Sequence, residues 1–243
     1  FLADVGNGKV STPLITTEAA TKLLGTMLGG YNVQPLIALL DNEEVGDIAV
    51  DALSNTLLIF DAFHDVFELS KRNERANKVL SSWAEAQWFL NKPAVPECIT
   101  AKVLKVDGEI NTDDLSPGPE AWSRPDIPLH ALSMLKNTDF KNPIGTINKL
   151  EESGHPVAFV GDVVGTGSSR KSATNSLLWH IGEDIPYIPN KRTGGICLGG
   201  KIAPIFFNTL EDSGTLALEC DVTNMEQGDT IDIYPHEGRI CSS

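Results

Sequence analysis

The spacing of apolar residues along the chain changes near residue 91. Before this point apolar residues recur every three or four positions, which predicts amphipathic helices. After residue 98 they alternate with polar residues in short runs, which predicts strands. The segment Asn91–Pro96 contains two prolines and interrupts both patterns. The sequence therefore predicts two domains, residues 1–97 and residues 98–243, joined at this segment.

The first domain is predicted to contain four helices joined by short connections. The first starts after Thr16 and ends at 29–30, and the second starts near Val33. The third follows residues 41–44, which form a capping-box pattern, and the fourth covers about residues 65–90. Short neighbouring helices of this kind are typical of helical arrays, and no repeat of fixed period accompanies them.

The second domain is predicted to mix strands with two or three helices, as in α+β or α/β proteins. A turn is expected at Asp107-Gly108, and residues 111–117 are too polar for the interior of a helix or strand. The expected strands are 99–106, 156–160, 184–189, 215–222 and 230–234. The expected helices are 130–135 and 168–179, and residues 202–210 are expected to form a helix or a strand–helix turn.

One glycine-rich stretch, Gly161-Asp-Val-Val-Gly-Thr-Gly-Ser-Ser-Arg170, lies between a predicted buried strand and a predicted helix. Glycines let backbone N–H groups approach a ligand closely, and the start of a helix adds a partial positive charge. Two hydroxyls and a guanidinium beside them suit a carboxylate better than a hydride donor. The stretch therefore predicts an anion-binding pocket.

Other interpretations of this stretch are less consistent with its residues. A dinucleotide-binding loop requires a third glycine where Arg170 stands, and a phosphate-binding P-loop requires Gly-Lys-Ser/Thr. Ser168-Ser-Arg-Lys171 matches a Ser-x-x-Lys nucleophile motif without its companion motifs. A purely structural role, in which Ser168 or Ser169 caps the helix, stays open. As a carboxylate site, Ser168 is a candidate base and Arg170 a bidentate ligand.

Composition limits the classes of function. With 41% hydrophobic and 21% charged residues, the 243-residue chain resembles a soluble globular protein. It has no apolar run long enough to span a bilayer and no signal-peptide pattern. A net charge of −14 argues against a general nucleic-acid scaffold. A local basic pocket is nevertheless expected from Arg170, Lys171, Lys191 and Arg192.

The four cysteines, Cys98, Cys197, Cys220 and Cys241, are widely spaced and include no Cys-x-x-Cys pair. This spacing fits neither a dense disulfide framework nor a self-contained zinc or iron–sulfur site. A reducing cytoplasm is the expected compartment. Because the chain starts at Phe1 without a methionine and stops abruptly at Cys241-Ser-Ser243, it is expected to be a piece of a longer protein.

Four blocks of the second domain together resemble the bacterial aconitase B family, and residues 16–91 resemble its N-terminal HEAT-like helical domain. The blocks are Gly161–Trp179, Asn111–Pro117, Ala121–His130 and Asn190–Thr209. The resemblance implies a HEAT-like helical array at residues 1–97. It also implies a swivelling β/β/α domain at residues 98–243, truncated at its C-terminus, that closes over an active site in other domains.

The resemblance also implies the chemistry. The family is a group of hydro-lyases of the tricarboxylic acid cycle that interconvert citrate and isocitrate through cis-aconitate, with 2-methylisocitrate as a second substrate. Ser168, Ser169 and Arg170 match its substrate-binding triplet, with Ser168 as the catalytic base. Arg124 matches a further arginine that binds a substrate carboxylate.

The cofactor and partners of the family follow from the same resemblance. It implies a [4Fe–4S] cluster whose cysteine ligands lie in later domains, so this piece alone is expected to be inactive. It further implies the remaining aconitase domains as partners, a homodimer through the helical domain, and mRNA binding when the cluster is lost, with no membrane. RNA contact would require a basic face of Lys71, Arg72, Arg75 and Lys78. A small subunit like that of isopropylmalate isomerase is the alternative, although such subunits are not expected to carry a helical array.

Overall fold

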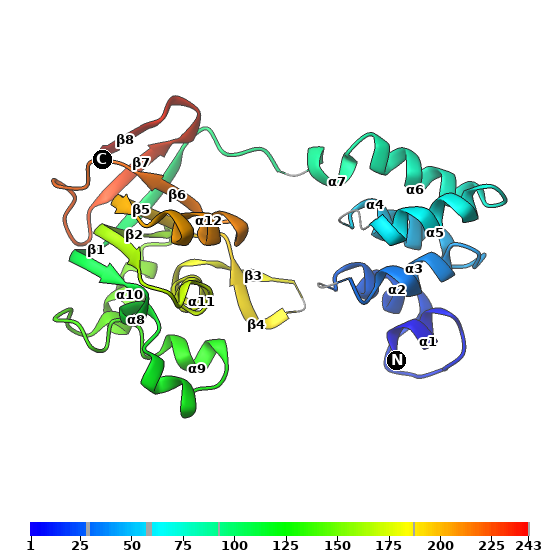
Figure 1. The fold of residues 1–243 in the computed structure, drawn as a ribbon, viewed down its shortest axis with the longest axis horizontal. Helices are drawn as coiled ribbons and strands as arrows, with labels where there is room; N and C mark the ends of the chain where they lie inside the picture. The colour runs from blue at the N-terminus through cyan, green and yellow to red at the C-terminus, as the bar shows by residue number, and fades with distance from the viewer. Residues whose placement is uncertain (28–29, 57–59, 92, 187, 243) are drawn as a thin grey trace. The chain divides into compact units, whose positions relative to one another are not determined.

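The chain forms two compact units, Phe1–Ala94 and Val95–Ser243. The computed structural model describes residues 1–27, 30–56, 60–91, 93–186 and 188–242. In Figure 1 the first unit is drawn in blue to cyan and is helical, and the second contains a sheet with helices. The chain is therefore a mixed α/β protein with a parallel sheet and a separate helical part.

The helices α2 to α6 of the first unit pack apolar side chains around a common core. Trp83 lies in this core, and its indole N–H donates a hydrogen bond of 2.9 Å to the carbonyl of Leu53. Thr16 caps the second helix by accepting from the N–H of Ala19, as predicted. The helices are α1 (Leu2–Gly6), α2 (Thr17–Gly25), α3 (Val33–Leu39), α4 (Gly46–Ser54), α5 (Phe60–Ser70), α6 (Glu74–Ala84) and α7 (Gln87–Leu90).

Two predicted helix boundaries in this unit are wrong. The helix expected over 65–90 is divided into α5, α6 and α7. The side chain of Asn73 accepts from two N–H groups and starts α6, and Ala86, with a φ of 54°, separates α6 from α7. The expected capping box at 41–44 does not start α4, which begins at Gly46. Asn42 instead accepts from the N–H groups that follow it and forms a turn before the helix. Of the glycines expected to end the first helix, Gly29 lies outside the described residues.

The second unit is built on a six-stranded sheet with the order β6-β5-β2-β1-β7-β8. The first four strands in this order are parallel, and β7 and β8 are antiparallel to their neighbours. The strands are β1 (Ile99–Asn111), β2 (Val157–Thr166), β5 (Ile196–Ile202), β6 (Leu216–Glu219), β7 (Thr230–Tyr234) and β8 (Arg239–Ser242), with β3 (Glu183–Ile185) and β4 (Ile188–Thr193) as a separate pair.

Each face of the sheet carries its own core. Phe159 on β2 and Leu104 on β1 belong to the core that the helices cover, and the neighbouring residues Val103 and Val160 belong to the core on the other face. This alternation is the period of two that strands impose on their side chains. The helices are α8 (Thr112–Leu115), α9 (Ile127–Ala131), α10 (Pro143–Glu151), α11 (Arg170–Ile181) and α12 (Pro204–Asp212), with 3-10 helices η1 (Gly118–Trp122) and η2 (Pro235–Glu237).

Three expectations for this unit need correction. Asp107-Gly108 does not end the first strand, because Gly108 adopts φ +82° in an irregularity within β1 and its N–H donates to the carboxylate of Asp162. The buried strand expected over 184–189 is instead the exposed pair β3 and β4. The helix expected over 130–135 begins earlier, as α9.

We predict that Asn73→Ala destabilises the first unit by about 1–2 kcal/mol, because the first N–H groups of α6 lose their acceptor. The Asn73 side chain also donates to the carbonyl of Leu40 at 3.1 Å, so the loss falls at the upper end of this range. Asn77→Ala is the matched control, since its side chain makes only a 3.4 Å bond to Ser70. Equal thermal unfolding midpoints for the two variants would contradict the prediction.

Candidate functional site

The glycine-rich turn lies at the carboxyl edge of the parallel strands. β1 and β2 run parallel, and their last paired residues are Asn111 and Thr166. β2 then leads through Gly167 and Ser168 into α11 (Figure 1). Ligands of open α/β sheets bind at this edge, beyond the carboxyl ends of the strands. The structure therefore places residues 167–170 at the edge of the sheet where the topology favours a ligand.

Two glycines, Gly165 near the end of β2 and Gly167 in the turn, are required by the local geometry. Gly165 and Gly167 adopt φ angles of +81° and +103°, which residues with a Cβ atom rarely adopt. A Cβ atom on Gly165 would lie 2.1 Å from the ring of Phe206, and one on Gly167 would lie 2.6 Å from the hydroxyl oxygen of Thr112. The backbone therefore packs directly on the core beneath it.

The polar side chains of the turn are free to bind a ligand. Ser168 and Ser169 are exposed, and Arg170 is partly buried. Within the described residues, neither the Ser168 hydroxyl nor the Arg170 guanidinium has a hydrogen-bond or ion-pair partner. Ser169 is the residue before α11, but its side chain accepts no N–H of the helix. The helix-capping role considered for Ser169 is therefore wrong in this structure.

The start of α11 adds backbone donors to these side chains. Its first internal hydrogen bond runs from the N–H of Ala173 to the carbonyl of Ser169, at 3.0 Å. The N–H groups of Arg170, Lys171 and Ser172 precede this bond and have no acceptor within the helix. Together with the helix dipole they favour an anion at this position.

Residues at the end of β1 and the start of α8 form hydrogen bonds to the turn and to the residue before it. The hydroxyl of Thr112 accepts a 3.2 Å bond from the N–H of Ser169, and the carboxylate of Glu109 accepts a 2.8 Å bond from the hydroxyl of Thr166. Sequence reasoning assigned residues 111–117 to a loop and missed these contacts. The pattern that could have found them is the capping box of Asn111 and Asp114, which starts α8.

Arg124, the second predicted carboxylate ligand, lies on a different segment between η1 and α9. Its Nε donates to a carboxylate oxygen of Glu120 at 3.0 Å, and its Nη1 donates to the carbonyl of Leu129 at 3.3 Å. Lys136 also pairs with Glu120, and the hydrogen bonds from Lys136 and Arg124 lower the pKa of this carboxyl group. None of these bonds joins Arg124 to the Ser168–Arg170 turn.

The basic pocket expected from four side chains is not formed. Arg192 lies at the opposite end of α11 from Arg170, where it donates to the carbonyl of Trp179 at 2.6 Å and pairs with Asp184 at 2.8 Å. Lys191 is exposed on β4 beside it. Because α11 has 12 residues, its two ends are separated by about 16 Å. Only Lys171 adjoins Arg170.

A partly buried ion pair stabilises the strand irregularity behind the site. The ammonium of Lys105, whose side chain is only 10% exposed, lies 2.7 Å from the carboxylate of Asp162. This bond, followed by the one from the N–H of Gly108, lowers the pKa of Asp162. The pair thereby links β1 to β2 just before the turn.

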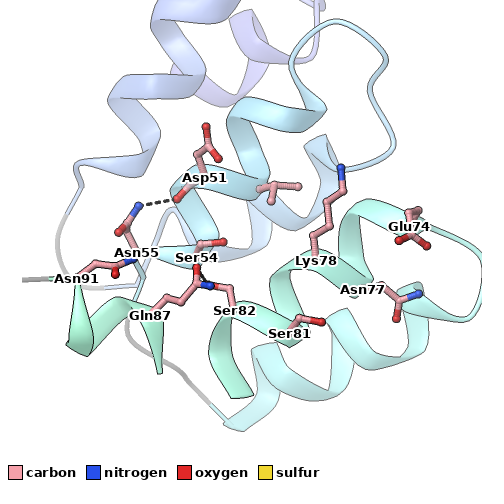
Figure 2. A pocket seen from close by; sticks show the side chains of 11 residues that line it. Asp51, Ser54, Asn55, Glu74, Asn77, Lys78, Ser81, Ser82, Gln87 and Asn91 are labelled. Carbon is pink, nitrogen blue, oxygen red and sulfur yellow. Dashed lines mark hydrogen bonds between the residues drawn. The ribbon is translucent and has the colours of Figure 1, made fainter. Parts of the chain in front are cut away.

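A separate polar groove lies in the first unit, between α4, α6 and α7 (Figure 2). Its volume is about 670 Å³, and Asn55 on its wall donates to the carbonyl of Asp51 at 2.8 Å. None of the predicted substrate-binding residues lines it, whereas Lys78 of the candidate RNA-binding face does. The lining residues are Val50, Asp51, Ser54, Asn55, Glu74, Asn77, Lys78, Ser81, Ser82, Gln87 and Asn91.

The cysteines of this chain do not fit an iron–sulfur cluster. Cys197 is fully buried in the helix-covered core, and burial raises its pKa to about 12, so it does not supply a thiolate. Burial also raises the pKa of Cys220. Among the described residues, no three His, Cys, Asp or Glu side chains lie together as metal ligands, and no helix is long and apolar enough to cross a bilayer.

Two family models match the chain. The one described as aconitate hydratase 2 N-terminus matches residues 101–243. The chain belongs to this family. The model described as the aconitate B N-terminal domain matches residues 1–89. The matched segments 101–243 and 1–89 fall within the second and first units of the chain, respectively.

Several curated proteins are similar to this chain along its whole length. It is 59% identical to aconitate hydratase B of Escherichia coli, covering 99% of this chain and 29% of that protein. It is 61% identical to aconitate hydratase B of Synechocystis, covering 100% and 28%. The Helicobacter pylori protein of the same name is 54% identical. The chain thus spans less than a third of the length of these relatives.

Among solved structures, the chain is similar to 3-isopropylmalate dehydratase of Methanocaldococcus jannaschii. The TM-score is 0.42 at 17% sequence identity, and the match covers 60% of this chain and 83% of that one.

We predict that Gly165→Ala destabilises the second unit by about 3 kcal/mol or more, because a methyl group there combines backbone strain with a collision against Phe206. Gly108→Ala is the matched control. Gly108 has a similar φ of +82° but no atom within 4 Å of the added methyl, so strain alone costs about 1–2 kcal/mol. Urea unfolding measures both, and equal losses would contradict the packing argument.

We also predict that Asp162→Asn destabilises the chain by about 1 kcal/mol at neutral pH, a modest effect because Asp162 is 45% exposed. A carboxyl group whose folded pKa is lowered contributes stability above its unfolded pKa, about 3.9, and loses it as the pH falls through the folded pKa. The difference between wild type and variant should therefore shrink below about pH 4. In Asp107→Asn, which removes an 89% exposed carboxylate 3.9 Å from Lys105, the difference should be near zero at every pH.

Proposed function

We propose that this chain is part of an aconitate hydratase, a hydro-lyase that interconverts citrate and isocitrate through cis-aconitate. The observation that carries the proposal is the turn at Ser168–Arg170, where unpartnered hydroxyls, a guanidinium and free backbone N–H groups meet at the carboxyl edge of the sheet. The relatives named aconitate hydratase B support the choice of substrate.

The proposed domains follow the two family matches. Residues 1–97 form a HEAT-like helical array, and residues 98–243 form a swivelling β/β/α domain that closes over a site contributed by other parts of the enzyme. The helical unit and the sheet-containing unit each have their own core, which supports an assignment as two domains.

A substrate carboxylate binds at the start of α11. The guanidinium of Arg170 donates two parallel hydrogen bonds to the carboxylate, each contributing about 1.5–3 kcal/mol. The Ser169 hydroxyl and the first-turn N–H groups of α11 supply further donors. Because citrate carries three carboxylates, a second ligand is required, and Arg124 takes this role through the N–H groups that Glu120 and Leu129 leave free.

Ser168 is the proposed base. In the dehydration of citrate or isocitrate, its oxyanion takes the proton from the carbon beside a carboxylate, while the hydroxyl group leaves the adjacent carbon and the double bond of cis-aconitate forms. Hydration returns the proton from the Ser168 hydroxyl. An unprotonated serine is unusual, and the adjacent guanidinium, the helix start and Lys171 are the groups that stabilise its negative charge.

The [4Fe–4S] cluster of the family is assigned to other parts of the full-length enzyme, since the cysteines of this chain do not fit it. Where it is bound, it supplies a Lewis acid for the leaving hydroxyl. The 243-residue chain by itself is accordingly expected to be inactive, and 2-methylisocitrate is a proposed second substrate of the full-length enzyme.

The two alternatives are less well supported. A stand-alone small subunit of an isopropylmalate-type isomerase would not require the helical unit that residues 1–89 form. An mRNA-binding face on this unit would require free basic side chains. Three of the four candidates instead pair with carboxylates, in the ion pairs Lys71–Glu68, Arg72–Asp41 and Arg75–Asp47. Dimerisation through this unit remains a proposal from the family.

We predict that Arg170→Lys in the full-length enzyme raises KM for citrate about tenfold or more. A planar guanidinium becomes a point charge, and the loss of one charged hydrogen bond of about 1.5 kcal/mol corresponds to a factor of about ten. Steady-state formation of cis-aconitate, followed by its ultraviolet absorbance, measures the change.

The matched control is Arg192→Lys, the same substitution at the opposite end of α11, which should leave KM unchanged. An unchanged KM and kcat in Arg170→Lys would remove Arg170 from the site. A full-length wild-type protein with its cluster intact that does not convert citrate would overturn the proposed function as a whole.

A further inference from the structure

Thr112 is buried directly beneath the Ser168–Arg170 turn. It is the first residue of α8, only 2% of it is exposed, and its hydroxyl oxygen accepts the 3.2 Å hydrogen bond from the N–H of Ser169. The same oxygen would lie 2.6 Å from a Cβ atom on Gly167. Thr112 therefore contacts the turn on both sides of Ser168, the proposed base.

The turn depends on the hydrogen bond to Thr112 because the glycines of its backbone can adopt many dihedral angles. Gly165 and Gly167 have no Cβ atoms to restrict their dihedral angles, and Ser169 makes no side-chain bond to the helix. The bond from Ser169 to Thr112 lies between Ser168 and Arg170 in the chain. A shift at this amide would move the hydroxyl and the guanidinium together.

Thr112 is itself held in place. The side chain of Asn111 accepts from the N–H groups of Asp113 and Asp114, and the carboxylate of Asp114 accepts from the N–H of Asn111 at 2.9 Å. This reciprocal capping box follows directly from β1, and α8 packs against α11. The hydroxyl of Thr112 is thus fixed to the sheet and not to a movable loop.

We propose that Thr112 is a positioning residue, whose hydroxyl, through the amide of Ser169, holds Ser168 and Arg170 in their catalytic arrangement. This inference rests on the proposed function of the turn. A displacement of about 1 Å in a catalytic group is enough to cost about a hundredfold in rate, so the role of Thr112 should be visible in kcat.

The test compares three variants of the full-length enzyme. Thr112→Val keeps the shape of the side chain but removes the acceptor, and it should lower kcat/KM for citrate about tenfold to a hundredfold. Thr112→Ser keeps the hydroxyl and should restore most of the activity. Thr174→Val is the matched control, because Thr174 is a 1% exposed threonine of α11 whose hydroxyl has no partner among the described residues. It should leave kcat/KM within twofold of wild type.

A second measurement does not depend on activity. Amide hydrogen exchange of Ser169, resolved by NMR in the 243-residue chain, should be at least tenfold faster in Thr112→Val than in wild type and close to wild type in Thr112→Ser. Faster exchange together with lost activity in the valine variant alone is the expected result.

The outcomes that overturn the inference are distinct from failure of the proposed function. Unchanged exchange at Ser169 in Thr112→Val would show that the hydroxyl does not hold the turn. Faster exchange at Ser169 with unchanged kcat/KM would show that the hydrogen bond from Ser169 to Thr112 does not contribute to catalysis. A loss of kcat/KM in Thr174→Val equal to that in Thr112→Val would assign the effect to core stability. An inactive wild-type enzyme would refute the proposed function, while the exchange experiment would still decide whether Thr112 holds the turn.

Discussion

The parallel pairing of β1 with β2 is the interaction on which the rest of the second unit depends. The pairing begins at Lys102 and Val157 and continues to Asn111 and Thr166. It is irregular between Val106 and Glu109, and β1 continues beyond this irregularity. Because the two strands end together, the residues that follow each of them meet at one edge of the sheet. Thr112 and the Ser168–Arg170 turn are neighbours for this reason, although 55 residues separate Thr112 from Ser168 in the sequence.

This pairing also explains how an acidic chain can present a site for an anion. The net charge of −14 is unfavourable for a tricarboxylate at long range. At the turn, however, the local groups are backbone N–H donors, hydroxyls and Arg170, and Arg170 has no acidic partner among the described residues. At contact distance such groups outweigh distant surface charges, which salt screens beyond about 10 Å. The proposed carboxylate site therefore depends on the local arrangement that the strands impose.

The sequence was most informative where a local pattern determines local structure. The apolar run 156–160 predicted a strand, and the hydroxyls and arginine after the last glycine predicted the start of a helix; these are β2 and α11. The expected glycine-rich turn is shorter than predicted, because β2 continues through Gly161 and Gly165 to Thr166. Composition and spacing could not show that Arg192 would lie at the opposite end of α11 from Arg170, because that follows from the β3–β4 pairing. The contact of Thr112 with the turn was likewise hidden, since it joins segments that are distant in the sequence. The helix boundary at Asn73 could have been predicted from the sequence, because asparagine is a common N-cap residue.

The central claim is that a substrate carboxylate binds at the start of α11. A crystal structure of the full-length protein with isocitrate bound tests it most directly. The account predicts a carboxylate about 3 Å from the Arg170 guanidinium and the first-turn N–H groups of α11, with the Ser168 hydroxyl facing the substrate carbon that loses its proton. Isocitrate bound elsewhere, with Arg170 and the start of α11 in contact with solvent alone, would contradict it.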